Sequence, residues 1–155
     1  MYQKIMVPLD SSKLAECVLP HVEAIAKGCG VQDVVFVRVV EPFSLMPVRG
    51  EPVFTEEQVK KFDSESKIVA EKYLEELVSR LNYGSANVHS ETLTGKTAES
   101  LADYADKNKV DLIIIATHGR SGISRWVLGS VADRILRSSC VPVLMVRAPG
   151  CVPSV

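Results

Sequence analysis

The sequence lacks the excess positive charge and the long apolar runs that are typical of nucleic-acid-binding and membrane proteins. Its 155 residues carry 18 Lys and Arg against 19 Asp and Glu, so the net charge of −1 provides no bulk field that favours DNA, RNA or anionic lipid. It also has no apolar run of about 18 residues, so no membrane-spanning segment is predicted. Residues 1–8 enter a strand pattern at once, and we expect no signal peptide. These features predict a protein that binds neither nucleic acid nor membrane.

Cysteine is present but is not arranged for a structural role. The four cysteines, Cys17, Cys29, Cys140 and Cys151, have none of the close spacings of a metal site or a disulfide framework. We therefore expect no protein-bound metal and a reducing, cytoplasmic environment. Cys140, beside an apolar strand, is predicted to be buried and inert.

Three patterns typical of catalytic sites are also missing. There is no Gly-x4-Gly-Lys-Ser/Thr motif for phosphate, and no acidic pair for magnesium is evident. No serine or cysteine nucleophile with a third orienting group accompanies His118, so this histidine is predicted to line a ligand or face solvent rather than act as a general base. We assign no catalytic residue from the sequence.

What is present is a regular alternation of strand and helix patterns. Apolar runs predict strands at 4–9, 33–40, 112–116 and 140–146, and the polar, weakly alternating segment 86–93 is predicted to be an edge strand. A helical pattern lies between each pair of strands. This alternation predicts an α/β domain over residues 1–147, an open five-stranded parallel sheet with helices on both faces and the strand order 3-2-1-4-5 of Rossmann-like, flavodoxin-like folds. Residues 148–155 are predicted to form a C-terminal tail.

Three helical patterns carry detailed expectations. Pro20 should kink or split the first helix. The apolar positions expected to mark the long second helix are Val59, Phe62, Val69, Tyr73, Leu77 and Leu81. The apolar face expected for the last helix consists of Leu128, Val131, Ala132, Ile135 and Leu136.

The segment 41–57 has three prolines and no clear period, and it is predicted to be a surface loop, with a lid as the alternative.

The most informative stretch joins the fourth strand to the last helix. It contains Gly119, Gly122 and Gly129 among small hydroxyl residues. Glycine lets backbone N–H groups approach a ligand, and a helix start presents unpaired N–H groups and a partial positive charge. The stretch therefore predicts an anion site, most often a phosphate site. Asp10, at the end of the first strand, is predicted to face it across the crevice, with helix capping as its alternative role.

The fifth strand bears on assembly. Residues Val141–Val146 are as apolar as a central strand, although the last strand is expected at an edge of the sheet. An exposed apolar edge favours pairing with another chain. We therefore expect a homodimer through this strand.

Taken together, these segments resemble the universal stress protein family over almost the whole chain. The resemblance rests on Ile5-Met-Val-Pro-Leu-Asp10-Ser-Ser, Val34-Val-Phe-Val-Arg-Val-Val-Glu41, Gly95, Ala116-Thr-His-Gly119 to Gly129-Ser130, and Val141-Pro-Val-Leu-Met-Val146. The family's ATP-binding branch has a glycine, two residues, a second glycine, nine residues, and then glycine with a small hydroxyl residue. Gly119, Gly129 and Ser130 fit that signature, whereas Ala116 replaces the first glycine and adds a methyl group near the ligand.

The resemblance implies a role for each matching residue. Asp10 would lie near the ribose or adenine, beside a wall formed by Pro8 and Leu9, and Val39 would offer backbone groups to the adenine edge. The other implied residues lie toward the ribose and phosphates: Ala116, Thr117, His118, Gly119, Arg120, Gly129, Ser130 and Val131.

Three functions follow as hypotheses. The first is a dimeric stress-response module that binds ATP, with or without magnesium, and has no efficient catalysis. The second is an enzyme, a slow ATPase or a nucleotidyl-transfer catalyst that uses the same site. The third is a dimeric interaction protein that does not bind nucleotide, which Ala116 favours.

Overall fold

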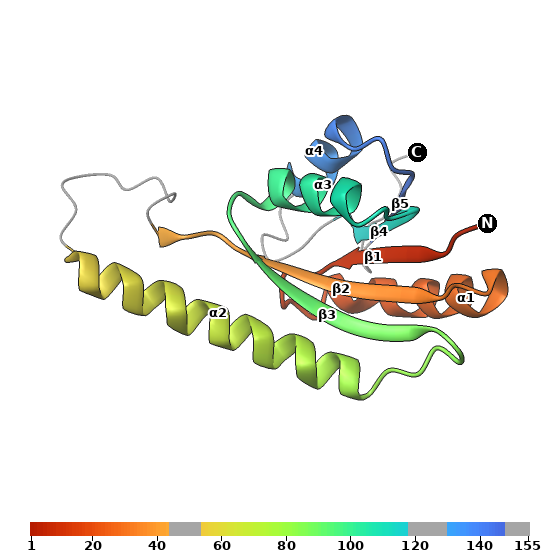
Figure 1. Ribbon diagram of the computed structural model, residues 1–155, viewed down its shortest axis with the longest axis horizontal. Coiled ribbons are helices and arrows are strands. Elements are labelled where there is room, and N and C mark those ends of the chain that lie inside the picture. Colours follow the sequence, from red (N-terminus) through yellow and green to blue (C-terminus); the bar gives the residue numbers. More distant parts are fainter. Residues whose placement is uncertain (44–53, 118–129, 148–155) are drawn as a thin grey trace, which may run out of the picture.

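The computed structural model describes residues 1–43, 54–117 and 130–147. Five strands form one parallel sheet in the order β3-β2-β1-β4-β5, which confirms the predicted fold (Figure 1). The elements in chain order are β1 (Lys4–Pro8), the 3-10 turn η1 (Ala15–Val18), α1 (Leu19–Cys29), β2 (Asp33–Val40), α2 (Glu56–Ser79), β3 (Asn87–Thr94), α3 (Thr97–Lys107), β4 (Leu112–Ala116), α4 (Ser130–Ser138) and β5 (Val143–Val146).

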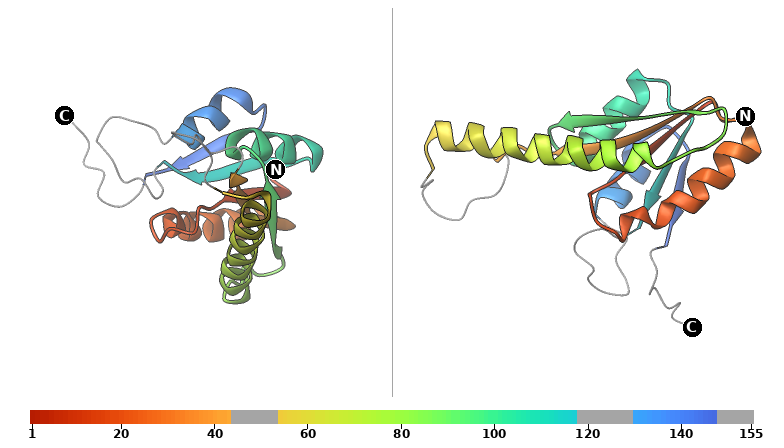
Figure 2. Two further views of the ribbon diagram at one scale, coloured as in Figure 1. Left: turned by 90° about the vertical axis from the view of Figure 1, so that its left-hand side faces the viewer. Right: turned by 90° about the horizontal axis from the view of Figure 1, so that it is seen from below.

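The sheet is the middle layer of three. Helices α1 and α2 cover one face of the sheet, and α3 and α4 cover the other (Figure 2). Alternate side chains of a strand point to opposite faces, so Ile5 and Val7 of β1 join the core beneath α1 and α2, whereas Met6 packs on the side of α3 and α4. All five residues of β4 are buried, as expected for a parallel strand covered on both faces. In the described part of the chain, no helix combines the length and the apolarity needed to cross a bilayer.

The helix boundaries follow local chemistry. Pro20 lies in the first turn of α1, where the missing N–H costs no intrahelical bond, and η1 precedes it as a separate turn. The predicted split of the first helix is therefore confirmed. Gly30 ends α1 in the left-handed conformation with a φ of 63°, which a residue without a Cβ adopts at little cost.

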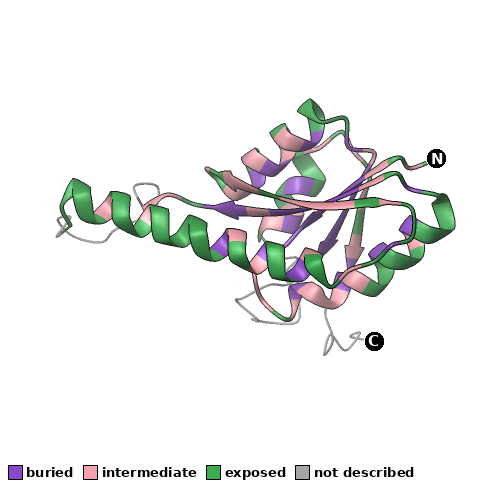
Figure 3. Cartoon of the chain, turned by 60° about the horizontal axis from the view of Figure 1, so that its bottom comes forward, coloured by how far each residue is buried: buried purple, intermediate pink, exposed green. Residues whose placement is uncertain are grey.

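The long helix α2 corrects one expectation. Thr55 and Gln58 form a reciprocal capping box at its start. The helix spans about 36 Å, about 10 Å more than the roughly 26 Å of eight-residue β2, and the N-terminal part of α2 projects past the sheet (Figures 1 and 3). Its buried positions are Ala70, Leu74 and Leu77. Phe62 and Val69, which we expected on the apolar face, are 45% and 67% exposed.

Three further expectations differ from the structure near the C-terminal end. Leu136 is 48% exposed, because α4 packs through Ala132 and Ile135 and the next position points about 100° away. Cys140 is exposed rather than buried, because it lies in the connection to β5. That strand begins at Val143, later than predicted, although the carbonyl of Pro142 still accepts from the Ile113 N–H at 2.9 Å.

Candidate functional site

The candidate ligand site lies where the strand order of the sheet reverses, between β1 and β4. β1 and β4 are adjacent, with Ile5 paired to Leu112 and Met6 to Ile113. From β1 the chain winds outward through β2 and β3, whereas β4 leads to β5 at the opposite edge. The helices that follow these two strands, α1 and α4, pack on opposite faces of the sheet. Ligands of open α/β sheets bind at the carboxyl ends of the strands where the strand order reverses in this way.

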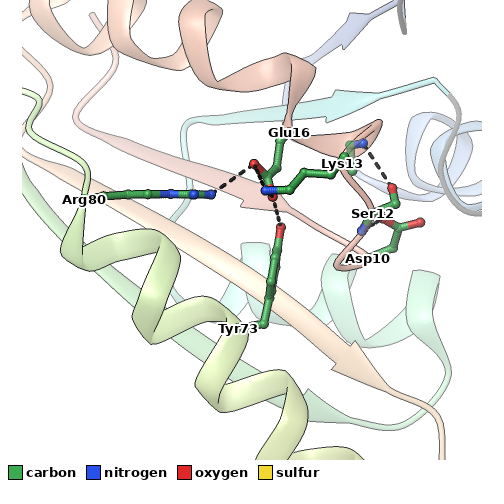
Figure 4. Close-up of polar contacts among 7 residues, drawn as sticks. Asp10, Ser12, Lys13, Glu16, Tyr73 and Arg80 are labelled. Atoms are coloured by element: carbon green, nitrogen blue, oxygen red, sulfur yellow. Dashed lines mark hydrogen bonds and ion pairs between the residues drawn. The ribbon is translucent and has the colours of Figure 1, made fainter.

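The segment after β1 is a tight, hydrogen-bonded turn. Pro8 and Leu9 are buried, and the Leu9 N–H donates to the Val37 carbonyl of β2 at 2.9 Å. The Asp10 Oδ1 then accepts from the Ser12 N–H at 2.9 Å, and the Ser12 Oγ accepts from the Ala15 N–H at 3.1 Å (Figure 4). Asp10 thus shapes the chain that leads into η1, so its side chain has a structural role whether or not it also contacts a ligand.

Hydrogen bonds to the Glu16 carboxylate connect this turn to α2 and its C-terminal end. Its carboxylate accepts from Lys13 Nζ at 3.1 Å, from the Tyr73 hydroxyl at 3.3 Å and from Arg80 Nη2 at 3.0 Å (Figure 4). Burial, together with the nearby negative charges of Glu16 and Asp10, raises the pKa of Tyr73 well above its usual range. This cluster could not be predicted from the sequence, because Glu16, Tyr73 and Arg80 lie far apart in the chain and Tyr73 fits an apolar helical pattern.

The carboxyl end of β4 is buried. Ala116 is 9% exposed and belongs to the core cluster on the side of α1 and α2. Thr117 is 5% exposed, and its N–H donates to the Val146 carbonyl of β5 at 2.9 Å. The Ala116 methyl group therefore packs within the protein core, so its exchange for glycine would affect core packing as well as any ligand.

At the end of β2, Val39 is buried on the side of α3 and α4. Two residues later, the Glu41 carboxylate accepts from the Thr97 N–H at 3.0 Å and from the Thr97 Oγ1 at 2.7 Å. These hydrogen bonds lower the pKa of Glu41, with a smaller contribution from the positive charge of Arg134 on α4. Glu41 therefore caps α3, a role that sequence reasoning missed because the two residues are far apart in the chain.

The phosphate side of the predicted site is only partly described. Ser130 is exposed at the start of α4, and Val131 is half-buried behind it. The other predicted residues on this side, His118, Gly119, Arg120 and Gly129, lie outside the described residues, as do Gly122 and Leu128. Among residues 1–43, 54–117 and 130–147, no three His, Cys, Asp or Glu side chains are grouped as metal ligands.

The sheet order and the adjacency of β1 and β4 assign the chain to the doubly wound α/β proteins, which bind ligands where the strand order reverses. Comparison with known proteins narrows the class: the sequence model of the universal stress protein family matches residues 1–147, and the chain belongs to that family. Universal stress protein MJ0531 from Methanocaldococcus jannaschii is 32% identical over 150 residues, which cover 96% of this chain and 84% of the relative.

Solved structures agree in fold. UspA from Lactobacillus plantarum superposes with a TM-score of 0.79 at 21% identity and covers 94% of this chain and 98% of its own. A universal stress protein in complex with cAMP has a TM-score of 0.66 at 24% identity, with coverage of 95% and 98%. An Arabidopsis thaliana family protein with AMP bound has a TM-score of 0.62 at 13% identity, with coverage of 96% and 93%.

Proposed function

We propose that this protein is a regulatory universal stress protein that binds an adenine nucleotide, ATP in the first place, beyond the carboxyl ends of β1 and β4. In this proposal it has no efficient catalysis, acts in the cytoplasm as a homodimer, and consists of one domain over residues 1–147 followed by a tail. The observation that carries the proposal is the adjacency of the Asp10 turn and the Thr117 end of β4 at the switch point of the sheet.

The start of α4 supports a phosphate position. Ser130 is the first residue of a nine-residue helix, and it follows the glycine-containing segment in the sequence. Backbone N–H groups at a helix start have no intrahelical partner, and the helix dipole favours an anion there. The complexes of two family members with cAMP and AMP support an adenine nucleotide as the ligand.

Calorimetric titration of nucleotide-stripped protein with ATP, with and without magnesium, tests the proposal. We expect saturable binding near one site per chain. Gly129→Val should weaken binding at least about tenfold, because a branched side chain would keep phosphate from the backbone. Gly28→Val is the matched control, since a Cβ at Gly28 of α1 has no atom within 4 Å. Equal affinity of the two variants would remove Gly129 from the phosphate site.

The same preparation separates the alternatives. Turnover of ATP to ADP or transfer of a nucleotidyl group at a physiologically useful rate would favour the enzyme. Absence of binding at millimolar ATP would favour the interaction protein, and Ala116→Gly would then show whether the methyl group is what prevents binding.

The proposed homodimer uses the edge strand β5, on which Leu144 is 36% exposed. Leu144→Lys is a better probe than a change at Val143, which is half-buried against the core on the side of α3 and α4. A charge at Leu144 should shift the mass in solution toward the monomer. An unchanged mass would place the dimer interface elsewhere.

A further inference from the structure

The outer face of α2 carries an unusual pair of exposed aliphatic side chains. Ile68 and Val69 are 62% and 67% exposed in the middle of the helix, and the middle of α2 is largely coloured as exposed in Figure 3. They lie away from Ala70, Leu74 and Leu77, the positions through which α2 packs on the rest of the protein. An exposed apolar site flanked by charged residues on the outer face of a helix is a candidate contact surface.

The charges around this pair have a symmetrical order. Lys61 and Glu65 precede it, and Lys72 and Glu76 follow it. Within the helix, the Lys61–Glu65 and Lys72–Glu76 charges are 3.9 and 4.0 Å apart, and all four side chains are at least 58% exposed. Such long, exposed pairs contribute little to the stability of the monomer, so the charges remain available to a partner.

We propose that this outer face of α2 (Lys61, Glu65, Ile68, Val69, Lys72 and Glu76) pairs with the same face of a second copy, in antiparallel orientation. The two-fold axis would pass between Ile68 and Val69. Glu65 and Lys72 lie equally far from that point on opposite sides, and so do Lys61 and Glu76. Each Lys therefore meets a Glu of the partner copy, while Ile68 packs against the partner copy's aliphatic pair.

The charges specify the orientation. In a parallel pair each lysine would face the same lysine of the other copy, and each glutamate the same glutamate, which is destabilising. The antiparallel arrangement removes every such clash. It also uses almost the whole helix, because the Ile68–Val69 midpoint lies near the centre of Glu56–Ser79.

The arrangement of the described elements leaves room for this pairing. α2 lies at the outside of the layer that it shares with α1, and its N-terminal part extends past the sheet (Figures 1 and 2). One helix face buries less than the roughly 800 Å² per partner of a standard interface, so the association is expected to be weak. This surface is separate from the edge of β5, and a chain with both could form assemblies larger than a dimer.

Sedimentation equilibrium over a concentration series tests the pairing in the Leu144→Lys background, which removes the proposed β5 contact. We expect this protein to self-associate weakly. Lys72→Glu should weaken that association at least about fivefold, because it places two glutamates opposite each other at two symmetry-related positions. Glu65→Lys should do the same, whereas the double variant Glu65→Lys/Lys72→Glu should restore association to within about twofold.

Lys67→Glu is the matched control. It reverses the same charge and likewise breaks an exposed pair within the helix, Lys67–Glu71, but it lies outside the proposed face. The proposal is overturned if the background protein remains monomeric at millimolar concentration, if Lys72→Glu acts no more strongly than Lys67→Glu, or if the double variant fails to restore association. Far-ultraviolet circular dichroism of each variant confirms that α2 is intact.

Discussion

Replacing Tyr83 by phenylalanine is expected to stabilise the protein. Tyr83 follows α2, is 3% exposed, and packs its ring against Phe36 with centroids 6.4 Å apart. Its hydroxyl oxygen is buried and has no hydrogen-bond partner among the described residues. Leaving a buried polar group unsatisfied costs about 1–3 kcal/mol. Tyr83→Phe removes that group and keeps the ring, so we expect a gain of about 1 kcal/mol at pH 7.

The same substitution should change the response to alkaline pH. Burial, with a contribution from the charge of Glu23, raises the pKa of Tyr83 to about 12. Below about pH 10 Tyr83 keeps its hydroxyl proton in both the folded and the unfolded chain, so its contribution to the free energy of unfolding does not change with pH. Between about pH 10 and 12 only the unfolded chain releases it, so about 3 kcal/mol is lost as pH rises. Tyr83→Phe lacks this loss, although Tyr73 and Tyr104, whose pKa values are also raised, still contribute theirs.

Urea denaturation followed by circular dichroism, at several pH values from 7 to 11, measures both effects. The midpoint should rise at pH 7 without a change in slope, since the surface exposed on unfolding is nearly the same. Tyr2→Phe, at a half-buried position near the N-terminus, is the control for loss of a hydroxyl group. A loss of about 1 kcal/mol or more on Tyr83→Phe would show that the hydroxyl has a hydrogen-bond partner, such as a buried water, and would refute the reasoning.

Two carboxylates that anchor helices give further predictions. Glu41→Gln should cost about 1 kcal/mol at pH 7 through the weakened cap of α3. Because the folded-state pKa of Glu41 is lowered, its contribution is present above about pH 4.3 and is lost as pH falls through the lowered pKa, so urea midpoints of wild type and variant should converge at acid pH. Glu16→Gln should cost about 1–2 kcal/mol, or a few degrees in Tm, because it weakens the contacts to Tyr73 and Arg80. Calorimetry would contradict this if Glu23→Gln, at an exposed i,i+4 pair, had an equal effect.

The fold could be predicted because the central strands β1, β2 and β4 are nearly continuous apolar runs. β2 was predicted as 33–40 and β4 as 112–116, and both have those bounds in the structure. A strand buried on both faces needs an apolar side chain at almost every position, so its limits are visible in the sequence. β5 was harder, because Pro142 donates no hydrogen bond to the ladder and the apolar run begins before the paired segment does.

The packing face of α2 could not be predicted as well. Tyr73 and Leu77 of the expected face do pack on the core, whereas Phe62 and Val69 are exposed. The helix is also seated through Ala70 and Leu74, which the spacing did not predict. A small side chain such as that of Ala70 lets a helix lie close to a sheet. Because alanine contributes little to a hydrophobicity pattern, this packing position is hard to predict from the sequence. The length of the sheet, which decides where α2 loses its support, depends on strands from other parts of the chain.

For the candidate site, the alternation of strands and helices was enough to predict that the ends of β1 and β4 meet, but it could not reveal how the turn after β1 is held. Ser11 adopts a left-handed φ of 67°, which costs a non-glycine residue about 1–2 kcal/mol. The Asp10–Ser12 and Ser12–Ala15 hydrogen bonds contribute about 1 kcal/mol each, and together they offset that strain. Glu16 then fixes the following turn to α2. The backbone of this turn is therefore ordered before any ligand binds, so ligand binding would not have to offset the conformational entropy lost when a loop becomes ordered.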